Sequence, residues 1–219
     1  EVLVIDDGST DDSLAKIQEI SEPRIRIIKN RKNIGLRQTL NQALKLSRGK
    51  YIARMDADDI SYPHRIATQV KFMDEHQDIS ICGSWFRIIP SGSIIRHPVT
   101  HNEIILQLFR DTAFGHPTVM FRGNFVKRTN LQYPESQAED YALWVSLIGK
   151  AMFANIPEVL LDYRWHGSNL SHSPGMGTTA QEISLSLLKR ATPEFTDRQS
   201  AAYLKLMRNE GKATPAEIL

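Results

Sequence analysis

The segment Asp56-Ala57-Asp58-Asp59 places three carboxylates within four consecutive residues. Bringing that much like charge together is costly unless a cation neutralises it. Carboxylate oxygens suit Mg²⁺ or Mn²⁺, particularly when phosphates fill the remaining coordination positions. The alternative is a solvated acidic turn before a helix that begins near Pro63. Short acidic motifs have high false-positive rates, so this segment alone leaves the two interpretations evenly balanced.

A second acidic loop, Asp6-Asp7-Gly8-Ser9-Thr10-Asp11, follows another apolar run. A carboxylate at its start can accept hydrogen bonds from a nucleotide base or a ribose, whereas Asp11 and Asp12 are typical first-turn acids of a helix. A phosphatase of the haloacid dehalogenase type would need an acid two positions before Asp7. Ile5 stands there, which excludes that class.

Further candidates lie downstream. Glu139-Asp140 opens a predicted helix, where adjacent acids are most often ordinary first-turn residues, although a positioned carboxylate could act as a general base. His116-Pro117-Thr118 and Tyr163-Arg164-Trp165-His166 offer polar groups beside predicted strands. An arginine and a histidine near a diphosphate could stabilise its departing charge. From the residues alone, a structural role is the more common one for each.

The elements that must position these side chains follow from apolar periodicity. Strands alternate with helices over the first ninety residues, which predicts an α/β fold with a mainly parallel sheet. Ligands bind such sheets at the carboxyl ends of strands, where both acidic loops stand. Strands are predicted at residues 2–5, 24–29, 51–55, 79–89, 119–121 and 151–161, with a hairpin turn at 90–93. Helices are predicted at residues 10–20, 33–46 and 138–148, from Pro63 onward, and in two stretches after Gly175 separated by Thr192-Pro193.

Composition narrows the class of protein. The 219 residues suit one domain with an appendage, and the formal charge of +2 gives no reason to expect a nucleic-acid partner. No apolar run approaches bilayer length, and the first residues show no signal-peptide pattern. Cys82, the single cysteine, stands in an apolar stretch and is predicted to be a buried, inert thiol. A cytoplasmic location is expected.

In combination, these segments resemble the inverting family 2 glycosyltransferases, which have a GT-A fold. The resemblance covers roughly residues 1–171 and is specific because its motifs occur in order. They are Val4-Ile5-Asp6-Asp7-Gly8-Ser9-Thr10-Asp11, Asn33-Ile34-Gly35, Asn41, Ser47-Arg48-Gly49-Lys50-Tyr51-Ile52-Ala53, Met55-Asp56-Ala57-Asp58-Asp59-Ile60-Ser61-Tyr62-Pro63-His64-Arg65, His116-Pro117-Thr118-Val119-Met120-Phe121-Arg122, Ala138-Glu139-Asp140-Tyr141-Ala142-Leu143-Trp144 and Tyr163-Arg164-Trp165-His166-Gly167-Ser168-Asn169-Leu170-Ser171.

The resemblance implies a role for individual residues. Asp7 matches the aspartate that binds the base, and Asp56 with Asp58 matches the D-x-D pair that binds the nucleotide sugar. Asp58 and Asp59 would hold Mn²⁺ or Mg²⁺. Asp140 matches the catalytic base. Arg164 and His166 match a segment that closes over the diphosphate.

The same resemblance implies the organisation and the partners of the chain. Residues 1–172 would form a GT-A domain, with a mixed, mainly parallel sheet flanked by helices, and residues 173–219 a helical C-terminal extension. Because the family begins with one more strand than is seen here, the domain is expected to lack its first strand. The expected donor is a UDP-sugar, and the acceptor a saccharide or a lipid-linked molecule. No transmembrane segment is expected, and the inner face of the membrane is an expected place of peripheral contact.

Two other functions stay open. A nucleotidyltransferase also uses paired carboxylates, a metal and an α/β sheet, but it gives no reason for Glu139-Asp140 and usually carries a basic, glycine-rich loop. A fragment that binds nucleotide sugars without catalysis is the other. Released nucleoside diphosphate would indicate glycosyl transfer, and released pyrophosphate would indicate nucleotidyl transfer.

Overall fold

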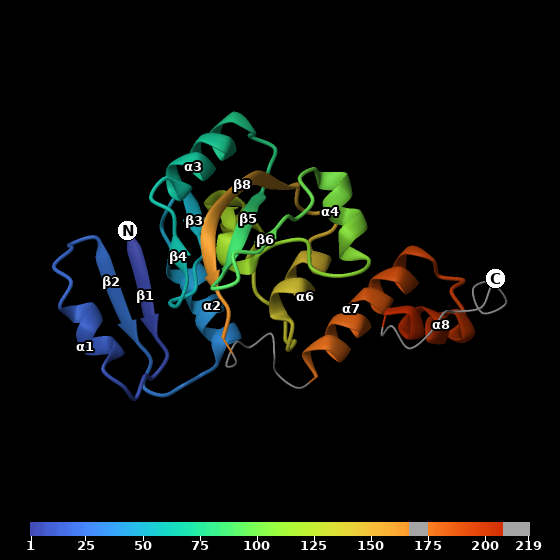
Figure 1. Cartoon of the computed structure of the whole chain (residues 1–219), viewed down its shortest axis with the longest axis horizontal. Coiled ribbons are helices and arrows are strands. Elements are labelled where there is room, and N and C mark those ends of the chain that lie inside the picture. The colour runs from blue at the N-terminus through green and yellow to red at the C-terminus, as the bar shows by residue number, and fades with distance from the viewer. Residues whose placement is uncertain (167–174, 208–219) are drawn as a thin grey trace.

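The structure is a computed structural model, and it describes residues 1–166 and 175–207 of the chain (Figure 1). Its strands are β1 (Val2–Asp6), β2 (Ile25–Lys29), β3 (Tyr51–Ala53), β4 (Ile60–Ser61), β5 (Ile81–Ile89), β6 (Ile94–Ile95), β7 (Met120–Arg122) and β8 (Phe153–Arg164). Its helices are α1 (Ser13–Gln18), α2 (Leu36–Leu46), α3 (Arg65–Glu75), α4 (His101–Leu108), a short 3₁₀ turn (His116–Thr118), α5 (Gly123–Thr129), α6 (Glu139–Ser146), α7 (Met176–Ala191) and α8 (Asp197–Met207).

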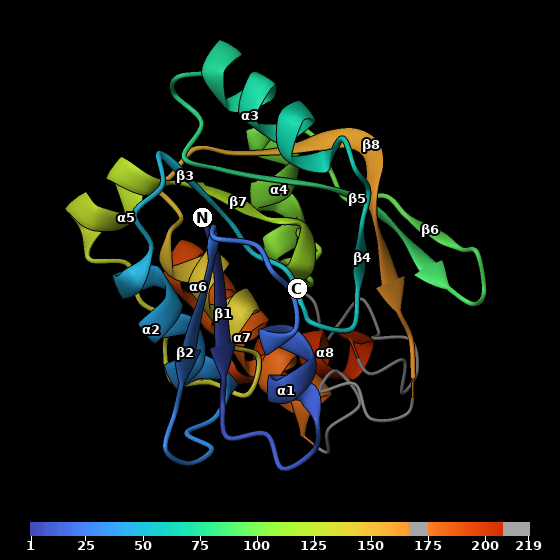
Figure 2. The same ribbon diagram turned by 90° about the vertical axis from the view of Figure 1, so that its left-hand side faces the viewer.

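The strands form two sheets. β1 and β2 pair in parallel as a separate ribbon, and the larger sheet has the order β3-β7-β5-β8-β4, with β6 added to β5. The ribbon lies at one end of the molecule and α7 with α8 at the other, with the larger sheet between them (Figure 1). A view from the side of the ribbon shows β8 running past β5 toward β4 (Figure 2).

The larger sheet is mixed. β5 pairs with β8 in parallel from Ile81 to Ile89, whereas the antiparallel pairings of β3 with β7, β5 with β7, β5 with β6 and β4 with β8 each join two or three residue pairs. The prediction of an α/β fold with a mixed sheet flanked by helices is therefore confirmed.

Apolar side chains pack on both faces of this sheet. One cluster contains Phe114, Phe121, Trp144 and Phe153 and joins α4 and α6 to the sheet. The other contains Met73 of α3 with Cys82 and Leu160. Cys82 is fully buried, as predicted, and burial raises the pKa of its thiol to about 12, so the sulfur stays protonated.

Helix α2 begins later than its sequence predicts. The apolar pattern indicated a start at Asn33, but the helix starts at Leu36. The backbone N–H groups of Ile34 and Gly35 instead donate to the Asp7 carboxylate, at 3.0 and 2.9 Å. Gly35 has a φ of 89°, outside the helical region. A contact between segments far apart in the sequence thus fixes the start of this helix.

The two helices predicted after Gly175 are present, and Thr192 caps the first of them. Leu187 of α7 is buried in the cluster that holds Trp144. The hydroxyls of Ser184 in α7 and Tyr203 in α8 both donate to the Phe109 carbonyl oxygen. The boundary predicted between residues 172 and 173 lies outside the described residues.

Candidate active site

The acidic loop of residues 56–59 follows β3. The backbone N–H of Arg54 donates to the Val119 carbonyl at 2.9 Å, so the pairing of β3 with β7 continues to the start of the loop. Strand β4 begins directly after Asp59 and pairs with β8. The loop is therefore fixed at both ends by strands of the larger sheet.

Asp56 is held by an arginine that was not predicted as a site residue. Arg54 donates from Nη1 to Asp56 Oδ2 at 2.6 Å, and its Nη2 lies 2.5 Å from Oδ1. The Arg54 side chain is only 10% exposed. Burial raises the pKa of Asp56, and Arg54 opposes this by favouring the ionised form. The signal for Arg54 in the sequence is a charged residue at the end of an apolar strand.

Asp58 and Asp59 are joined to the end of β8, more than one hundred residues later. His166 Nε2 lies 2.8 Å from Asp58 Oδ2, and Arg164 Nε donates to the Asp58 carbonyl at 2.7 Å. The backbone N–H of Arg164 donates to Asp59 Oδ1 at 2.9 Å. The structure therefore brings four predicted residues, Asp58, Asp59, Arg164 and His166, into one cluster.

The loop fits a divalent cation of the kind that also binds phosphate. Asp59 is buried, burial raises its pKa to about 6, and within the described part of the chain its Oδ2 has no hydrogen-bond partner. The described residues contain no group of three His, Cys, Asp or Glu side chains placed to hold a metal ion. Mg²⁺ commonly takes only one or two protein carboxylates and completes its shell with water and phosphate. Asp58 and Asp59 suit that mode of binding.

Asp7 lies in a different environment. Its carboxylate accepts hydrogen bonds from Asn30 Nδ2 at 2.8 Å and from the backbone N–H groups of Ile34 and Gly35. Burial favours the neutral form, but these donors outweigh it and lower the pKa of Asp7. The contacts resolved for Asp7 join the β1 and β2 loops to α2, and none of them reaches residues 56–59.

Gly8 allows these two loops to approach each other. Its φ is 80°, and a Cβ atom at this position would lie 2.8 Å from the backbone nitrogen of Asn33. A side chain there would force the loops apart.

Glu139 and Asp140 form the first turn of α6, as predicted. Burial raises the pKa of Glu139 to about 7, and it also raises the pKa of Asp140. His116 Nδ1 lies 3.9 Å from Glu139 Oε1, and His116 Nε2 lies 2.9 Å from the Tyr133 hydroxyl. Burial holds the pKa of His116 well below its usual value, so the imidazole is neutral. His116 therefore lies with the Glu139-Asp140 pair rather than with the acidic loop.

Arg54 links the two groups of acids. Its positive charge favours the ionised forms of Asp56, Glu139 and Asp140, in each case against burial. The side chain is therefore close enough to act on both the loop after β3 and the start of α6. A cation near acids that burial would otherwise neutralise offsets part of the rise in their pKa.

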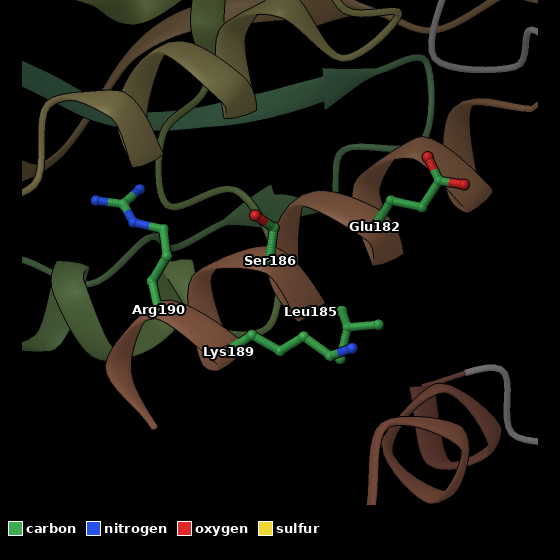
Figure 3. A pocket seen from close by; sticks show the side chains of 5 residues that line it. All are labelled: Glu182, Leu185, Ser186, Lys189 and Arg190. Atoms are coloured by element: carbon green, nitrogen blue, oxygen red, sulfur yellow. The ribbon is translucent and has the colours of Figure 1, made fainter. Parts of the chain in front are cut away.

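The hollow in Figure 3 lies elsewhere. It encloses about 420 Å³ on α7 and is lined by Glu182, Leu185, Ser186, Lys189 and Arg190, all from that one helix. None of the acids described above borders it. Of the helices in the described ranges, none combines the length and the apolar character needed to cross a bilayer.

Comparisons with known proteins identify relatives along most of the chain. The sequence profile of the family described as "Glycosyl transferase family 2" matches residues 1–133. An uncharacterized glycosyltransferase of Haemophilus influenzae is 35% identical over 201 residues, which cover 84% of this chain and 62% of that protein. The Escherichia coli protein WfaP, named a UDP-Glc:alpha-D-GlcNAc-diphosphoundecaprenol beta-1,3-glucosyltransferase, is 30% identical over 78% of this chain and 68% of its own.

Solved structures share the fold. TarS residues 1–349 of S. aureus, in complex with UDP-GlcNAc, superpose with a TM-score of 0.71 at 18% identity, covering 99% of this chain and 65% of that fragment. The mannosyltransferase PcManGT of Pyrobaculum calidifontis, in complex with GDP-Man and Mn²⁺, gives a TM-score of 0.56 at 14% identity, covering 96% and 70%. The chain spans less than two thirds of the length of the Haemophilus influenzae relative and 37% of a longer solved TarS chain.

Proposed function

The chain belongs to glycosyl transferase family 2, and from that premise we propose that it moves a sugar from a nucleotide-diphosphate sugar to an acceptor hydroxyl with inversion. One observation carries the proposal. The acidic loop meets Arg164 and His166 at the end of β8, while the Glu139-Asp140 pair faces the same arginine, Arg54, as the loop does. The acidic loop can bind a cation, Arg164 and His166 can bind an anion, and the Glu139-Asp140 pair can accept a proton. These three groups therefore occur in one region of the molecule.

The donor is bound by the two loops at the ends of β1 and β3. Asp7 would contact the base, and Asp56 and Asp58 the nucleotide sugar. A UDP-sugar is favoured because TarS was solved with UDP-GlcNAc and WfaP is named for UDP-Glc. Arg164 and His166 lie beside Asp58 and would contact the diphosphate, whose negative charge grows as it leaves.

Asp58 and Asp59 would hold Mn²⁺ or Mg²⁺. The solved complex of PcManGT with GDP-Man and Mn²⁺ supports a divalent cation at such a site. When bound, the cation supplies positive charge against the departing diphosphate. The protein's own part would be to hold Asp58 and Asp59 in place through the contacts with the end of β8.

Asp140 would act as the general base. It would take the proton from the acceptor hydroxyl as that oxygen attacks the anomeric carbon from the face opposite the nucleotide. The new bond forms as the bond to the diphosphate breaks, so a single displacement inverts the configuration. The raised pKa of Asp140 makes it a stronger base than an exposed aspartate.

The acceptor would be a saccharide or a lipid-linked molecule, which the name of WfaP supports. We place the activity in the cytoplasm, with peripheral contact at the inner face of the membrane. Residues 1–172 would form the transferase domain, and residues 173–219 a helical C-terminal extension.

Product analysis tests the proposed function. The chain is incubated with UDP-glucose, UDP-GlcNAc and GDP-mannose in turn, with Mn²⁺, and the released nucleotides are separated. Release of nucleoside diphosphate is expected from at least one donor. In a parallel incubation with UTP and glucose 1-phosphate, pyrophosphate release would instead identify a nucleotidyltransferase. Binding of the nucleotide sugars without any release would identify a binding module.

The proposal also predicts how the metal binds. Because phosphates complete the coordination shell, the affinity for Mn²⁺ should be higher in the presence of UDP than in its absence. Calorimetric titration of Mn²⁺ with and without UDP measures this difference. Equal affinity in the two titrations would contradict a cation site shared with the nucleotide.

A further inference from the structure

A buried arginine and a buried glutamine lie one turn apart on the inner face of α3. Arg65 is 1% exposed and Gln69 is 0% exposed. Arg65 Nε donates to Gln69 Oε1 at 3.0 Å, so the two side chains hold each other in place. Such residues are rarely buried to this extent, because removing their polar groups from water is costly. We call them the Arg65–Gln69 pair.

The pairing of β3 with β7 stops at Arg54, and Arg65 binds the strand there. The Arg54 N–H donates to the Val119 carbonyl at 2.9 Å. In an antiparallel pair of this kind, the Val119 N–H would return a bond to the Arg54 carbonyl. It donates instead to the His116 carbonyl, at 3.3 Å. Arg65 Nη2 donates to the Arg54 carbonyl at 2.6 Å and so takes the place of the missing backbone donor.

Gln69 binds the neighbouring segment at the same level. Its Nε2 donates to the carbonyl of Thr118, the last residue of the 3₁₀ turn, at 2.8 Å. The pair therefore joins two segments at the point where both leave the sheet. One is the chain that runs from Arg54 into the acidic loop, and the other is the turn whose His116 faces Glu139.

The pair also places a positive charge near the acidic loop. Burial lowers the pKa of Arg65 to about 10, which leaves the guanidinium charged at neutral pH, and the Asp59 carboxylate favours that charged form. In the described part of the chain, the hydrogen bonds of this guanidinium go to an amide and to a backbone carbonyl rather than to a carboxylate. Burying a charge in this way is unfavourable for stability alone, which points to a role in the site.

We propose that the Arg65–Gln69 pair is a positioning element that holds the acidic loop in the geometry needed to bind the cation and the diphosphate. This inference rests on the proposed function, and neither residue has to touch the donor. Arg54 binds Asp56, so a shift of the Arg54 backbone would move the first carboxylate of the loop. Groups that bind a metal or a phosphate must be held to within about 0.5 Å of their working positions.

Another arginine provides a matched control. Arg122 donates from Nε to the Ile79 carbonyl at 3.0 Å and from Nη2 to the Met73 carbonyl at 2.9 Å. It therefore joins the other end of α3 to β7 through the same kind of contact, away from the acidic loop. The variants are Arg65→Met, Arg65→Lys and Arg122→Met, each in the 219-residue chain.

Amide hydrogen exchange, followed by mass spectrometry, tests the positioning without any ligand. Arg65→Met should speed exchange in peptides that cover residues 53–62 and 115–119. Arg122→Met should speed it around residues 73–80 instead. Arg65→Lys keeps the charge and one donor, so it should have a smaller effect at the same places, and it replaces Arg65→Met if that variant does not fold.

Calorimetric titration with UDP in the presence of Mn²⁺, well below the melting temperatures, measures the consequence for the donor site. Arg65→Met should weaken UDP binding by about tenfold, since a hydrogen bond from a charged group contributes about that much. Arg65→Lys should weaken it less, and Arg122→Met should leave it unchanged while lowering the melting temperature.

A purely structural role predicts a different result. Both methionine variants would then lose stability and bind UDP equally well, which would overturn the inference. Unchanged exchange at residues 53–62 in Arg65→Met would overturn it too. A wild type that does not bind UDP would count against the proposed function, and the exchange measurement would still decide whether the pair positions the loop.

Discussion

The carboxyl groups of the site differ in how their charge is balanced. Burial raises the pKa of Asp56, Asp59, Glu139 and Asp140, whereas three hydrogen-bond donors lower that of Asp7. The Asp7 carboxylate thus has its hydrogen-bond donors within the protein, whereas an added positive charge would stabilise the ionised forms of the other four acids. At the level of single residues, this contrast favours the loop after β3 over the loop after β1 as the cation site.

The raised pKa of Glu139 has a consequence for stability. The pKa of Glu139 is 4.5 in the unfolded chain and about 7 in the folded protein. Between these values the folded state binds more protons, so the free energy of unfolding falls as the pH rises from 4.5 to 7. Urea denaturation at several pH values measures it. Glu139→Gln should remove on the order of 2 kcal/mol of that fall.

Asp59 contributes to the same fall, so the variant should reduce the slope without abolishing it. Glu194→Gln, at an exposed position, is the control and should behave as the wild type does. A slope that is identical in Glu139→Gln and in the wild type would mean that Glu139 is not desolvated in solution.

The identity of the general base is tested by Asp140→Asn, which keeps the shape of the side chain and removes the proton acceptor. Sugar transfer should fall by about 10²- to 10⁴-fold. Binding of UDP, measured by calorimetry, should change little because a base acts on the acceptor. Asparagine would be tolerated at a purely structural first-turn position. Transfer that stays near the wild-type rate would therefore remove Asp140 from the mechanism and leave Glu139 as the candidate.

At the scale of elements, the end of β8 decides the geometry of the acidic loop. His166→Ala removes the contact with Asp58 and should weaken binding of UDP with Mg²⁺ by about tenfold, because charge-assisted contacts are among the stronger ones. The melting temperature should not change. His64→Ala is the matched control, since His64 makes a similar contact with Glu158 on the surface. Equal UDP affinity in both variants would show that the contact at the end of β8 does not contribute to donor binding.

Most elements could be predicted from local patterns, and the exceptions have physical causes. β5, β8, α6, α7 and α8 follow apolar periodicity. The predicted start of α2 was three residues too early. The backbone N–H groups of Ile34 and Gly35, which precede the helix, bind Asp7, far away in sequence. Helix α4 was overlooked, although the capping box formed by Thr100 and Glu103 marks its start.

Contacts between segments far apart in the sequence could not be predicted from local sequence patterns. The motifs named Asp58, Asp59, Arg164 and His166 as candidates, but only the fold shows that they touch. Arg54 was missed for the same reason. Its sequence neighbours form a strand, and its importance comes from the acids of α6, which lie more than eighty residues away.

At the scale of the whole molecule, α7 shares a core with α4, α6 and the larger sheet. Leu187 of α7 is 4% exposed. Leu187→Ala should lower the free energy of unfolding by about 2–5 kcal/mol, in one cooperative transition. Leu206→Ala, at a 45% exposed position of α8, should cost less than about 0.5 kcal/mol. An early, separate transition for the C-terminal helices in Leu187→Ala would show instead that they fold independently.

The contact between the acidic loop and β8 also sets an order of events during synthesis. Asp58 and His166 are 108 positions apart, so the ribosome adds the residue that anchors the loop about 5–20 s after it adds the loop itself. During that interval the nascent chain carries its cluster of carboxylates without Arg164 and His166. The proposed donor site is therefore complete only once β8 has been made.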